Sequence, residues 1–477
     1  MKVLFAASEA LPFKSSGGLA EVAGSLPAAL RRRLIGARVV LPLYDTIPAE
    51  LKESMRFLTH IVVPVAWRRQ YCGIFEAKAN GVIYYLLDNQ YYFKRGKQIY
   101  GYYDDAERFA FFARAVLEIL PHLEGWKPDI IHCNDWQTAL TPVFQAAFYG
   151  KSEYYQSIRT VFTIHNIEYQ GKYGMEILED VFGLDGRYRT LVEHDGCVNL
   201  MKGGIECADA VTTVSPTYAG QILDPWYSHG LDSILRPRQQ KLSGILNGID
   251  VVGYDPAADP AIAAPFSAGD PTGKAADKTA LQQLYGLEEA PRKPLFGIVS
   301  RLVEHKGLDL LRAKLRALLN GTEAQLAVLG TGEWQYEEFF RQLARDYPGR
   351  VGVKIDFIPA VSRQIYAGAD LLLMPSKSEP CGLSQMIALR YGCIPVVRET
   401  GGLKDSVSDS GTGEGNGFTF PGYSAEQLLH AMLRAVEGYK NEEGWQQLVR
   451  RAMECDNSWA KSASAYIKLY KGLLAKP

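Results

Sequence analysis

The sequence lacks long apolar runs and any excess of charge of one sign. No window of its 477 residues approaches the roughly 18 consecutive apolar residues that a membrane-spanning helix requires. The 52 Lys and Arg residues nearly balance the 53 Asp and Glu residues, which leaves a formal net charge of −1. A near-neutral chain has no bulk electrostatic attraction to a nucleic acid or an anionic membrane, so we expect neither partner.

Metal-binding and disulfide patterns are missing as well. The seven Cys residues include no C-x-x-C pair, and the eight His residues form no H-E-x-x-H motif. An odd number of Cys fits a reducing compartment better than a disulfide framework, so we predict a cytoplasmic protein with no metal and no other cofactor. Glu9 interrupts the apolar start of the chain, which favours a buried first strand over a secretory signal.

What the sequence does contain is a repeated order of a short Val/Ile/Leu-rich run, a loop and a helical pattern. Apolar runs of this length are typical of parallel strands covered on both faces. Two such series of similar size predict an α/β protein with two Rossmann-like, doubly wound domains. The predicted strands are Val3–Ala7, Asp129–Cys133, Arg159–Ile164 and Ala210–Val214 in the first half, and Pro294–Ser300, Gln325–Leu329, Val351–Phe357, Asp370–Pro375 and Ile394–Val397 in the second.

The seam between the domains is predicted at the turn residues Asn247-Gly248, ahead of a segment rich in Ala, Pro, Gly and Asp. We therefore assign residues 1–246 to the first domain and 247–456 to the second. Between Ile61 and Asp88 the pattern alternates and aromatics are frequent. This stretch predicts antiparallel hairpins inserted into the first domain.

Glycine-containing loops follow predicted strands in both halves. Gly17-Gly18 opens a helical pattern in the first half, and Thr400-Gly401-Gly402 does so in the second. Backbone N–H groups at a helix start attract anions, so both loops are candidates for binding a phosphate. A plain tight turn explains either loop equally simply. Neither forms the G-x-G-x-x-G motif that a nicotinamide-dependent dehydrogenase would carry.

The second half adds charged residues in two of its loops. Arg301 and Lys306 follow a predicted strand, where a planar guanidinium and an ammonium suit a diphosphate. Glu379 precedes Pro380 and a predicted helix. Solvated surface cations and a helix-capping carboxylate are the simpler explanations. Their occurrence together with a glycine loop in one domain favours a crevice for a nucleotide diphosphate.

Polar side chains beside aromatics follow two strands of the first half. The segments His132–Gln137 and Thr163–Gln170 combine His, Asn, Asp or Glu with Trp or Tyr. Such pairs suit a sugar, whose hydroxyls form hydrogen bonds while an apolar ring face stacks on the aromatic. A structural histidine within the core is the alternative for His132 and for His165.

In order and spacing, these segments closely resemble the bacterial and plastid glycogen (starch) synthases, which are retaining glycosyltransferases of the two-domain GT-B type. The resemblance covers almost the whole chain. It also rests on Ser8-Glu9, Y-Y-D-D-A-E-R-F at 102–109, N-L-M-K-G-G at 199–204, T-T-V-S-P-T-Y at 212–218 and Ser458-Trp459.

The resemblance implies transfer of glucose from ADP-glucose to the non-reducing end of glycogen or another α-1,4-glucan, with retention and without a metal. It implies two domains that face a cleft, with a final helix in 457–477 that crosses back to complete the first domain. A close alternative is a GT-B enzyme that uses UDP-glucose, because base choice depends on a few contacts in the pocket.

Roles for individual residues are implied in the same way. Arg301 and Lys306 would neutralise the diphosphate, and Glu379 would hold the donor glucose or place a ribose or sugar hydroxyl. The His165 carbonyl would steady an oxocarbenium-like transition state. The loops of Gly18 and Gly402 would donate N–H groups to the diphosphate, and Phe357 would stack on the adenine. The donor-side residues implied besides Arg301, Lys306 and Glu379 are Gly17, Gly18, Asn247, Phe357, Cys381, Gly382, Leu383, Thr400, Gly401 and Gly402. The sugar or acceptor side would be lined by Glu9, Lys14, Glu21, Tyr102, Asp135, Trp136 and Asn166.

At two positions this chain departs from the usual pattern of the family, and a third distinguishes it from many other GT-B enzymes. The family usually has Lys two residues before Gly-Gly, whereas here Ser15 stands there and Lys14 lies one residue earlier. Glu21 stands where Asp is commoner. Ile387, eight residues after Glu379, stands where many other GT-B enzymes have a second Glu, which favours the glycogen synthases. A non-catalytic carbohydrate-binding protein, the remaining alternative, would have no need of Glu379 and Arg301.

Overall fold

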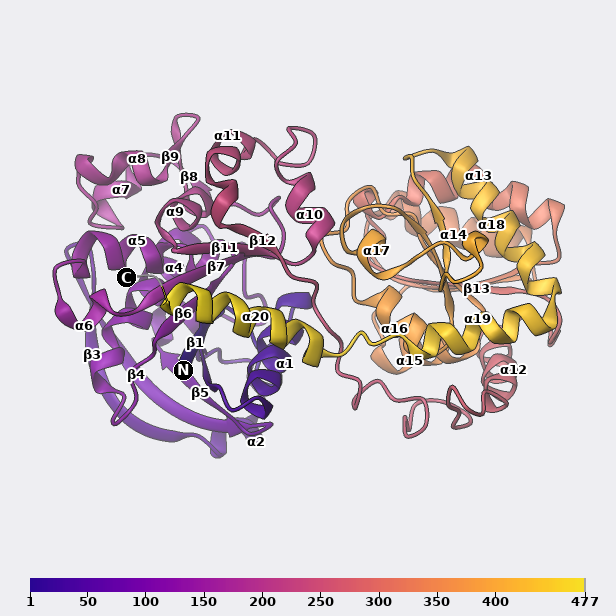
Figure 1. Cartoon of the computed structure of the whole chain (residues 1–477), viewed down its shortest axis with the longest axis horizontal. Coiled ribbons are helices and arrows are strands. Elements are labelled where there is room, and N and C mark those ends of the chain that lie inside the picture. The colour runs from indigo at the N-terminus through magenta and orange to yellow at the C-terminus, as the bar shows by residue number, and fades with distance from the viewer. Residues whose placement is uncertain (476–477) are drawn as a thin grey trace. The chain divides into compact units, whose positions relative to one another are not determined.

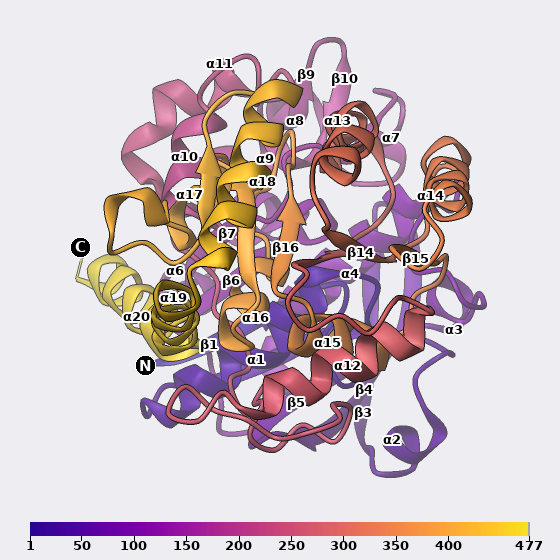
Figure 2. The same cartoon turned by 90° about the vertical axis from the view of Figure 1, so that its right-hand side faces the viewer.

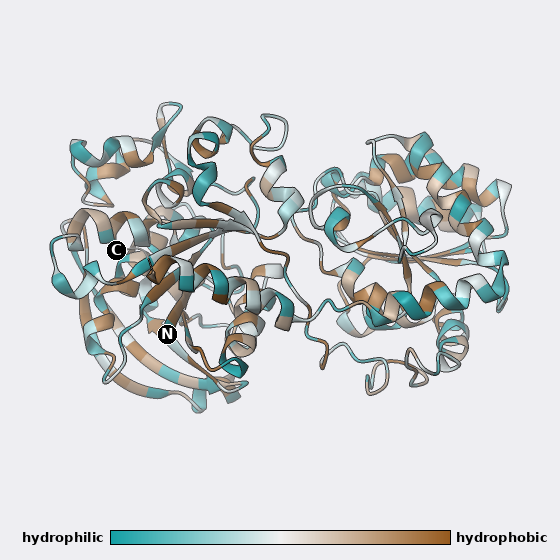
Figure 3. Cartoon of the chain, in the orientation of Figure 1, coloured by the Kyte–Doolittle hydropathy of each residue, from teal (hydrophilic) through white to brown (hydrophobic). Residues whose placement is uncertain are grey.

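The computed structural model describes residues 1–475, and the chain divides into two units, each with its own large sheet (Figure 1). Unit 1 contains Met1–Ile245 and the C-terminal segment from Trp459, and unit 2 contains Leu246–Ser458. Both are α/β structures with helices packed on mainly parallel strands, as the alternation of strand and helix patterns predicts. In both, brown apolar residues gather on the strands and teal polar residues on the outer faces of the helices (Figure 3).

The large sheet of unit 1 has nine strands among the described residues, in the order β12-β11-β7-β6-β1-β2-β5-β4-β3. Neighbours from β12 to β5 are parallel, whereas β4 is antiparallel to both β5 and β3. The hairpins expected between Ile61 and Asp88 are thus confirmed, and they extend the main sheet because β5 also pairs with β2. The strands are β1 Lys2–Ala6, β2 Gly36–Pro42, β3 Arg56–Val65, β4 Arg68–Ala79, β5 Val82–Asp88, β6 Ile130–Asn134, β7 Arg159–Ile164, β11 Ala210–Thr213 and β12 Leu242–Gly244; β8 Lys172–Tyr173, β9 Glu193–His194 and β10 Cys197–Asn199 form a small second sheet.

Helices cover both faces of this sheet, as two neighbouring residues of β6 show. His132 contacts Tyr470 of α20 (Trp459–Leu474), and Cys133 contacts Thr141 of α5 (Leu140–Phe144). Successive residues of a strand point to opposite faces, so α20 and α5 lie on opposite sides. The last helix, α20, also packs against α1 (Gly18–Arg32), beside which it runs in Figure 1. The other helices of unit 1 are α2 Ala49–Glu53, α3 Gln90–Phe93, α4 Asp105–Glu118, α6 Glu153–Gln156, α7 Ile177–Asp180, α8 Arg189–Val192, α9 Leu200–Cys207, α10 Pro216–Gln221 and α11 Asp232–Leu235.

The sheet of unit 2 is parallel throughout its described strands, in the order β15-β14-β13-β16-β17-β18. Helix α12 packs with α15 and α16 with α19, while α13 packs with α18, and Figure 2 shows the two groups on opposite faces. The strands are β13 Leu295–Val299, β14 Gln325–Leu329, β15 Val351–Lys354, β16 Leu371–Met374, β17 Ile394–Arg398 and β18 Phe418–Phe420; the helices are α12 Gly273–Tyr285, α13 Leu308–Gly321, α14 Trp334–Asp346, α15 Pro359–Gly368, α16 Ser384–Arg390, α17 Gly401–Ser406, α18 Ala425–Lys440 and α19 Glu442–Glu454.

Two predicted features need correction or comment. The strand predicted over Val351–Phe357 ends at Lys354, because its only neighbour, β14, ends opposite that residue and no ladder partner remains. Strand β2 was not predicted at all, although it lies next to β1 near the centre of its sheet. Within the described residues, no helix combines the length and apolarity needed to cross a bilayer.

Candidate active site

Glu379 and Lys306 form an ion pair just beyond the carboxyl ends of the unit 2 strands. Lys306 Nζ lies 2.7 Å from Glu379 Oε2, and the Ser376 hydroxyl donates to the same oxygen at 3.0 Å. Glu379 is 7% exposed, and its other oxygen accepts no hydrogen bond from the described residues. A buried carboxylate with one cation and one free oxygen can accept a hydrogen bond from a ligand hydroxyl.

Three neighbouring contacts hold these two loops together. Gly307 has φ of +72°, and a Cβ there would lie 2.0 Å from the Pro375 carbonyl oxygen, so only glycine permits this close approach. The Lys377 N–H donates to the His305 carbonyl at 2.9 Å. Arg398, the last residue of β17, is 6% exposed and donates to the Ser376 carbonyl at 2.9 Å and the Lys377 carbonyl at 2.5 Å. Sequence reasoning missed Arg398, because it reads as the end of a strand.

The other predicted donor-side residues differ in their surroundings. The exposed guanidinium of Arg301 has no partner among the described residues. Asn247 is 5% exposed and lies beside Cys381, yet its Oδ1 is buried and has no hydrogen-bond partner in the part of the chain that the structure describes. Burial raises the pKa of the Cys381 thiol to about 12, so it is not a thiolate nucleophile near neutral pH. Phe357 is 80% exposed, beyond the end of β15.

The glycine loop at the start of α17 packs directly on the Glu379 segment. Gly401 has φ of +44°, and a Cβ there would lie 2.0 Å from the Glu379 carbonyl oxygen. The Gly402 N–H donates to the carbonyls of Glu379 and Pro380, both at 3.2 Å. In this structure, therefore, the Gly402 N–H is engaged within the protein. Its neighbour Thr400 is the N-cap of α17, Gly382 has φ of +70°, and Leu383 is the N-cap of α16.

In unit 1, the loops after β6 and β7 bring His165, Asn134 and Asp135 together. His165 Nε2 lies 2.9 Å from Asn134 Oδ1, and the His165 N–H donates to Asp135 Oδ1 at 2.7 Å. Asp135 holds this position with φ of +56°, a conformation uncommon for a non-glycine residue. Burial lowers the pKa of His165 to about 4, so its ring is neutral at pH 7. Burial raises the pKa of Asp135 to about 7.

The loop after β1 adds an acidic residue and a free helix start. Glu9, 3% exposed, accepts a hydrogen bond from the Ser16 N–H, and burial raises the pKa of its carboxyl group. The N–H groups of Gly18 and Leu19, in the first turn of α1, have no partner among the described residues. Apart from the chain neighbours and the backbone of α1, no described atom lies within 4 Å of a Cβ built on Gly17 or Gly18, so this helix start is open.

The remaining predicted residues of unit 1 have partners of their own. Lys14 Nζ donates to Thr46 Oγ1 at 2.6 Å and to the Lys97 carbonyl at 3.3 Å. Glu21 lies in the first turn of α1. Trp136 packs edge-on against Phe109 with ring centroids 5.2 Å apart. The Tyr102 hydroxyl donates to the carbonyls of Arg95 and Gln98, and Asn166 Oδ1 accepts the Glu168 N–H at 3.0 Å.

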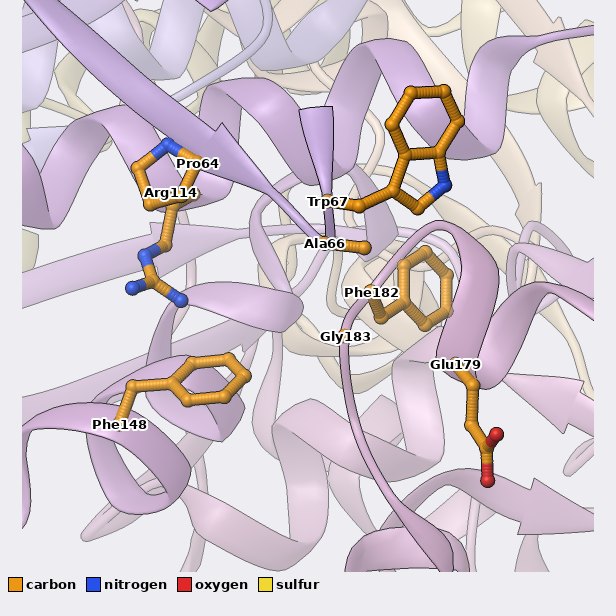
Figure 4. A pocket seen from close by; sticks show the side chains of 8 residues that line it. All are labelled: Pro64, Ala66, Trp67, Arg114, Phe148, Glu179, Phe182 and Gly183. Atoms are coloured by element: carbon orange, nitrogen blue, oxygen red, sulfur yellow. The ribbon is translucent and has the colours of Figure 1, made fainter. Parts of the chain in front are cut away.

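A hollow of about 360 Å³ lies elsewhere on unit 1, between the β3–β4 turn, α4 and the loop after α7 (Figure 4). Its lining residues are Pro64, Ala66, Trp67, Arg114, Phe148, Glu179, Phe182 and Gly183. No residue predicted for the site is among them. Across the described residues, no group of three or more His, Cys, Asp or Glu side chains stands close enough to hold a metal ion.

Comparison with known proteins agrees with this architecture. Residues 2–237 match the starch synthase catalytic domain family, and residues 286–451 match the glycosyl transferases group 1 family. The catalytic domain of starch synthase IV from Arabidopsis thaliana, solved with ADP and acarbose, superposes with a TM-score of 0.91 at 37% identity, covering 100% of this chain and 99% of that one. Sucrose-phosphate synthase from Thermosynechococcus elongatus shares the fold, with a TM-score of 0.61 at 17% identity over 100% of both chains.

Two glycogen synthases are closely similar over their whole length. The enzyme of Geobacillus thermodenitrificans is 51% identical over 480 residues, covering 100% of this chain and 98% of the relative. That of Desulforamulus reducens is 49% identical over 478 residues, covering 99% of each. Two Rossmann-like units that carry these matches define a glycosyltransferase of the GT-B fold. Within that class, the chain belongs to the glycogen synthase family.

Proposed function

We propose that this protein transfers glucose from ADP-glucose to the non-reducing end of an α-1,4-glucan, with retention of the anomeric configuration. The observation that carries the proposal is the partly buried Lys306–Glu379 pair, whose carboxylate keeps one oxygen free of partners among the described residues. Family membership and the similarity to a starch synthase solved with ADP and acarbose support the choice of an adenine nucleotide and a glucan.

On the donor side, we assign the diphosphate to Arg301 and Lys306. Cleavage of the sugar–phosphate bond develops negative charge on the leaving ADP, and fixed cations stabilise that charge more than they stabilise the ground state. The Arg301 guanidinium has no partner within residues 1–475, whereas the ammonium of Lys306 already has Glu379 beside it. A diphosphate that draws Lys306 away would leave Oε2 of Glu379 with the Ser376 hydroxyl alone, so that this oxygen could also accept a hydrogen bond from a donor hydroxyl.

The free N–H groups of Gly18 and Leu19 are a second anion site in this proposal, because a helix start binds a phosphate. The engaged N–H of Gly402 is assigned a packing role instead, since it holds the Glu379 segment in place. Lys14, bonded to Thr46 and Lys97, is not needed for either role. Asn247, through its unpartnered Oδ1, is assigned to a donor hydroxyl.

On the acceptor side, we assign the transition state to the His165 segment. Positive charge develops on the sugar ring as the glycosidic bond breaks, and a neutral imidazole with a fixed carbonyl adds no repulsive charge. Asp135 fixes the segment through its 2.7 Å contact with the His165 N–H. Glu9, Glu21, Tyr102, Trp136 and Asn166 are assigned to the sugar or acceptor, and Phe357 to the adenine base.

Two further features of the protein belong to the proposal. We assign it to the cytoplasm, where its seven unpaired Cys residues would stay reduced. We also propose that no metal takes part, since Arg301 and Lys306 supply the positive charge that a metal would bring. Transfer from UDP-glucose is the second candidate, because an exposed aromatic such as Phe357 stacks on either base.

The test is incorporation of labelled glucose into glycogen, with ADP-glucose and UDP-glucose run side by side in the presence of a chelator. We expect transfer from ADP-glucose at least about tenfold faster than from UDP-glucose, which corresponds to about 1.4 kcal/mol in the barrier. Equal rates would overturn the donor assignment, and dependence on added metal would overturn the metal-free mechanism.

Glu379→Gln keeps the shape of the side chain and removes its charge, so it tests the carboxylate itself. We expect turnover to fall by about 10²-fold or more. Glu399→Gln is the matched control, because that carboxylate accepts a hydrogen bond from Thr419 and lies on the next loop of unit 2. A rate for Glu379→Gln equal to that of the control would remove Glu379 from the site.

A further inference from the structure

Helix α20 forms a hydrogen bond with His132, a buried residue of β6 that lies next to the His165 cluster. The Tyr470 hydroxyl of α20 lies 2.7 Å from His132 Nδ1, and His132 Nε2 lies 2.5 Å from Thr163 Oγ1. Thr163 Oγ1 lies 2.6 Å from Thr212 Oγ1 on β11. Each of these four side chains is at most 1% exposed, so the chain of hydrogen bonds runs entirely through the protein interior.

The His132 ring is uncharged and connects Tyr470 to Thr163. Burial lowers its pKa to about 3, with a smaller repulsive effect from His165, so the ring is neutral at pH 7. A neutral imidazole has one N–H donor and one acceptor nitrogen, and here one nitrogen faces Tyr470 while the other faces Thr163. The rings of Phe5 and Tyr466 pack against it with centroids 4.5 and 5.4 Å away.

The register of β6 and β7 carries this contact to the site. Side chains two residues apart on a strand share a face, so Asn134 lies on the same face of β6 as His132. His165 is the first residue after β7, two positions beyond Thr163, and its ring is placed by Asn134. The first pair, His132 and Thr163, is bonded at 2.5 Å, and the second pair, Asn134 and His165, at 2.9 Å. Thr163 also accepts the Asp135 N–H on its carbonyl at 2.9 Å, and Asp135 in turn fixes the His165 N–H.

Helix α20 belongs to unit 1 although it follows the whole of unit 2 in the sequence. The chain enters α20 directly from unit 2, because unit 2 ends at Ser458 and the helix begins at Trp459. The helix is also held by the rings of Tyr466 and Tyr470 against His132 and by its packing on α1, contacts that anchor it without the hydrogen bond to His132.

From this geometry we infer that Tyr470 is a positioning residue for His165, acting through His132 and Thr163, so that the seating of α20 sets the orientation of the imidazole. The inference deepens the proposed function and rests on the role given there to the His165 segment. A small displacement of a reacting group is enough to lower turnover strongly without changing how tightly substrates bind.

Tyr470→Phe in the full chain tests the inference, because it removes one hydroxyl and keeps the ring. We expect kcat to fall about tenfold, with the KM values for donor and glucan within twofold of the parent. The matched control is Tyr155→Phe, which removes another buried hydroxyl of unit 1, bonded to the Leu117 carbonyl at 3.1 Å. The two variants should lose similar amounts of thermal stability, but only Tyr470→Phe should lose turnover. Equal kcat values for the two would overturn the inference.

A spectroscopic readout separates positioning from mere stability. Imidazole ¹⁵N spectra of the histidine-labelled chain, with the His165 signal assigned by its loss in His165→Gln, should show that signal shifted in Tyr470→Phe and unshifted in Tyr155→Phe. Thr163→Val, which breaks the same hydrogen-bond chain from the other end, should shift it as well. An unmoved His165 signal in both variants would overturn the inference, even if turnover had fallen.

The two proposals fail in distinguishable ways. If no sugar nucleotide supports transfer, the proposed function fails, while the ¹⁵N shift still decides whether Tyr470 orients His165. If transfer occurs, Tyr470→Phe in a His165→Gln background should cause no further loss of kcat, because the imidazole that Tyr470 orients is already gone while the main-chain carbonyl remains. A full tenfold loss in that background would show that Tyr470 acts by another route.

Discussion

The two units each carry a Gly-Gly-Leu segment at the start of a helix, and the segments differ in what surrounds them. Around Gly17 and Gly18 there is open space, and the N–H groups of Gly18 and Leu19 have no partner among the residues that the structure describes. Around Gly401 and Gly402, carbonyl oxygens of the 379–381 segment would lie 2.0 Å from an added Cβ. The same short motif therefore leaves a helix start open to a ligand in unit 1 and closes a protein contact in unit 2.

The clusters of side chains beside these two loops differ in their charge. In unit 2, the Glu379 carboxylate is already paired with the Lys306 ammonium, and backbone contacts fix both loops. In unit 1, His165 is neutral and Asp135 titrates near neutral pH. A charged, rigid cluster suits a leaving diphosphate, and a nearly neutral one suits a sugar that gains positive charge. In the proposed reaction, unit 2 would supply fixed charges for the leaving diphosphate, and unit 1 would supply uncharged polar groups for the sugar.

The largest effect is expected at the charged cluster. Lys306→Ala should lower kcat by about 10²- to 10³-fold, because a fixed cation next to the developing charge is lost. Circular dichroism should show an intact fold. Lys377→Ala is the matched control, since that lysine lies on the adjoining loop, is more exposed and faces Glu304 at 3.7 Å. An unchanged rate in soluble Lys306→Ala protein would break the distinction between the two clusters.

The two glycine loops should respond differently to the same substitution. Gly401→Ala should destabilise the protein by about 3 kcal/mol or more, because a left-handed residue acquires a side chain that collides with a backbone carbonyl. Gly17→Ala should change stability by no more than about 0.5 kcal/mol, since its backbone is extended and its surroundings are open. Urea unfolding of both variants measures the difference, and equal losses would contradict the comparison.

In the cluster of His165 and Asp135, the ionisation of Asp135 should change activity and stability in opposite directions as the pH rises. Asp135 must ionise to accept the His165 N–H most strongly, so kcat/KM should rise as pH increases through about 7. Its pKa is higher in the folded protein than in the unfolded chain, so its stabilising contribution is present below about pH 4 and is lost as pH rises through about 7. Asp135→Asn should flatten both profiles. A rate inflection near pH 7 that survives in Asp135→Asn would assign it to another group.

The smallest effect is expected at Phe357. Phe357→Ala should weaken nucleotide binding by about tenfold or less, because one stacking contact is worth about 0.5–1.5 kcal/mol. At 80% exposure, its removal should leave thermal stability unchanged. Calorimetric titration with ADP, compared with titration by a maltooligosaccharide, measures the two affinities. Equal loss of both would contradict a role for Phe357 in stacking on the base.

Hydrogen-bond partners explain why the sequence predicts some elements well and others poorly. Apolar runs that end at a glycine or polar loop, such as Gln325–Leu329, match their strands because each lies inside a parallel sheet and is covered on both faces. The run after Val351 was predicted too long, since a strand lasts only while a neighbour pairs with it. Strand β2, seven residues beginning Gly-Ala-Arg, was missed because its apolar part is short and follows a basic helix end.

The α/β class and the loops that carry the polar residues could be predicted from the amino-acid sequence, because hydrophobic period and turn chemistry are local properties of the chain. Its motifs also sufficed to indicate the family and most of the candidate site. The pairing of Lys306 with Glu379, the different surroundings of Gly402 and Gly18, and the contact of Tyr470 with His132 follow from the packing of the folded chain. These contacts join residues that are up to 338 positions apart. Such distances in sequence are closed by the packing of whole sheets and helices, which no local pattern records.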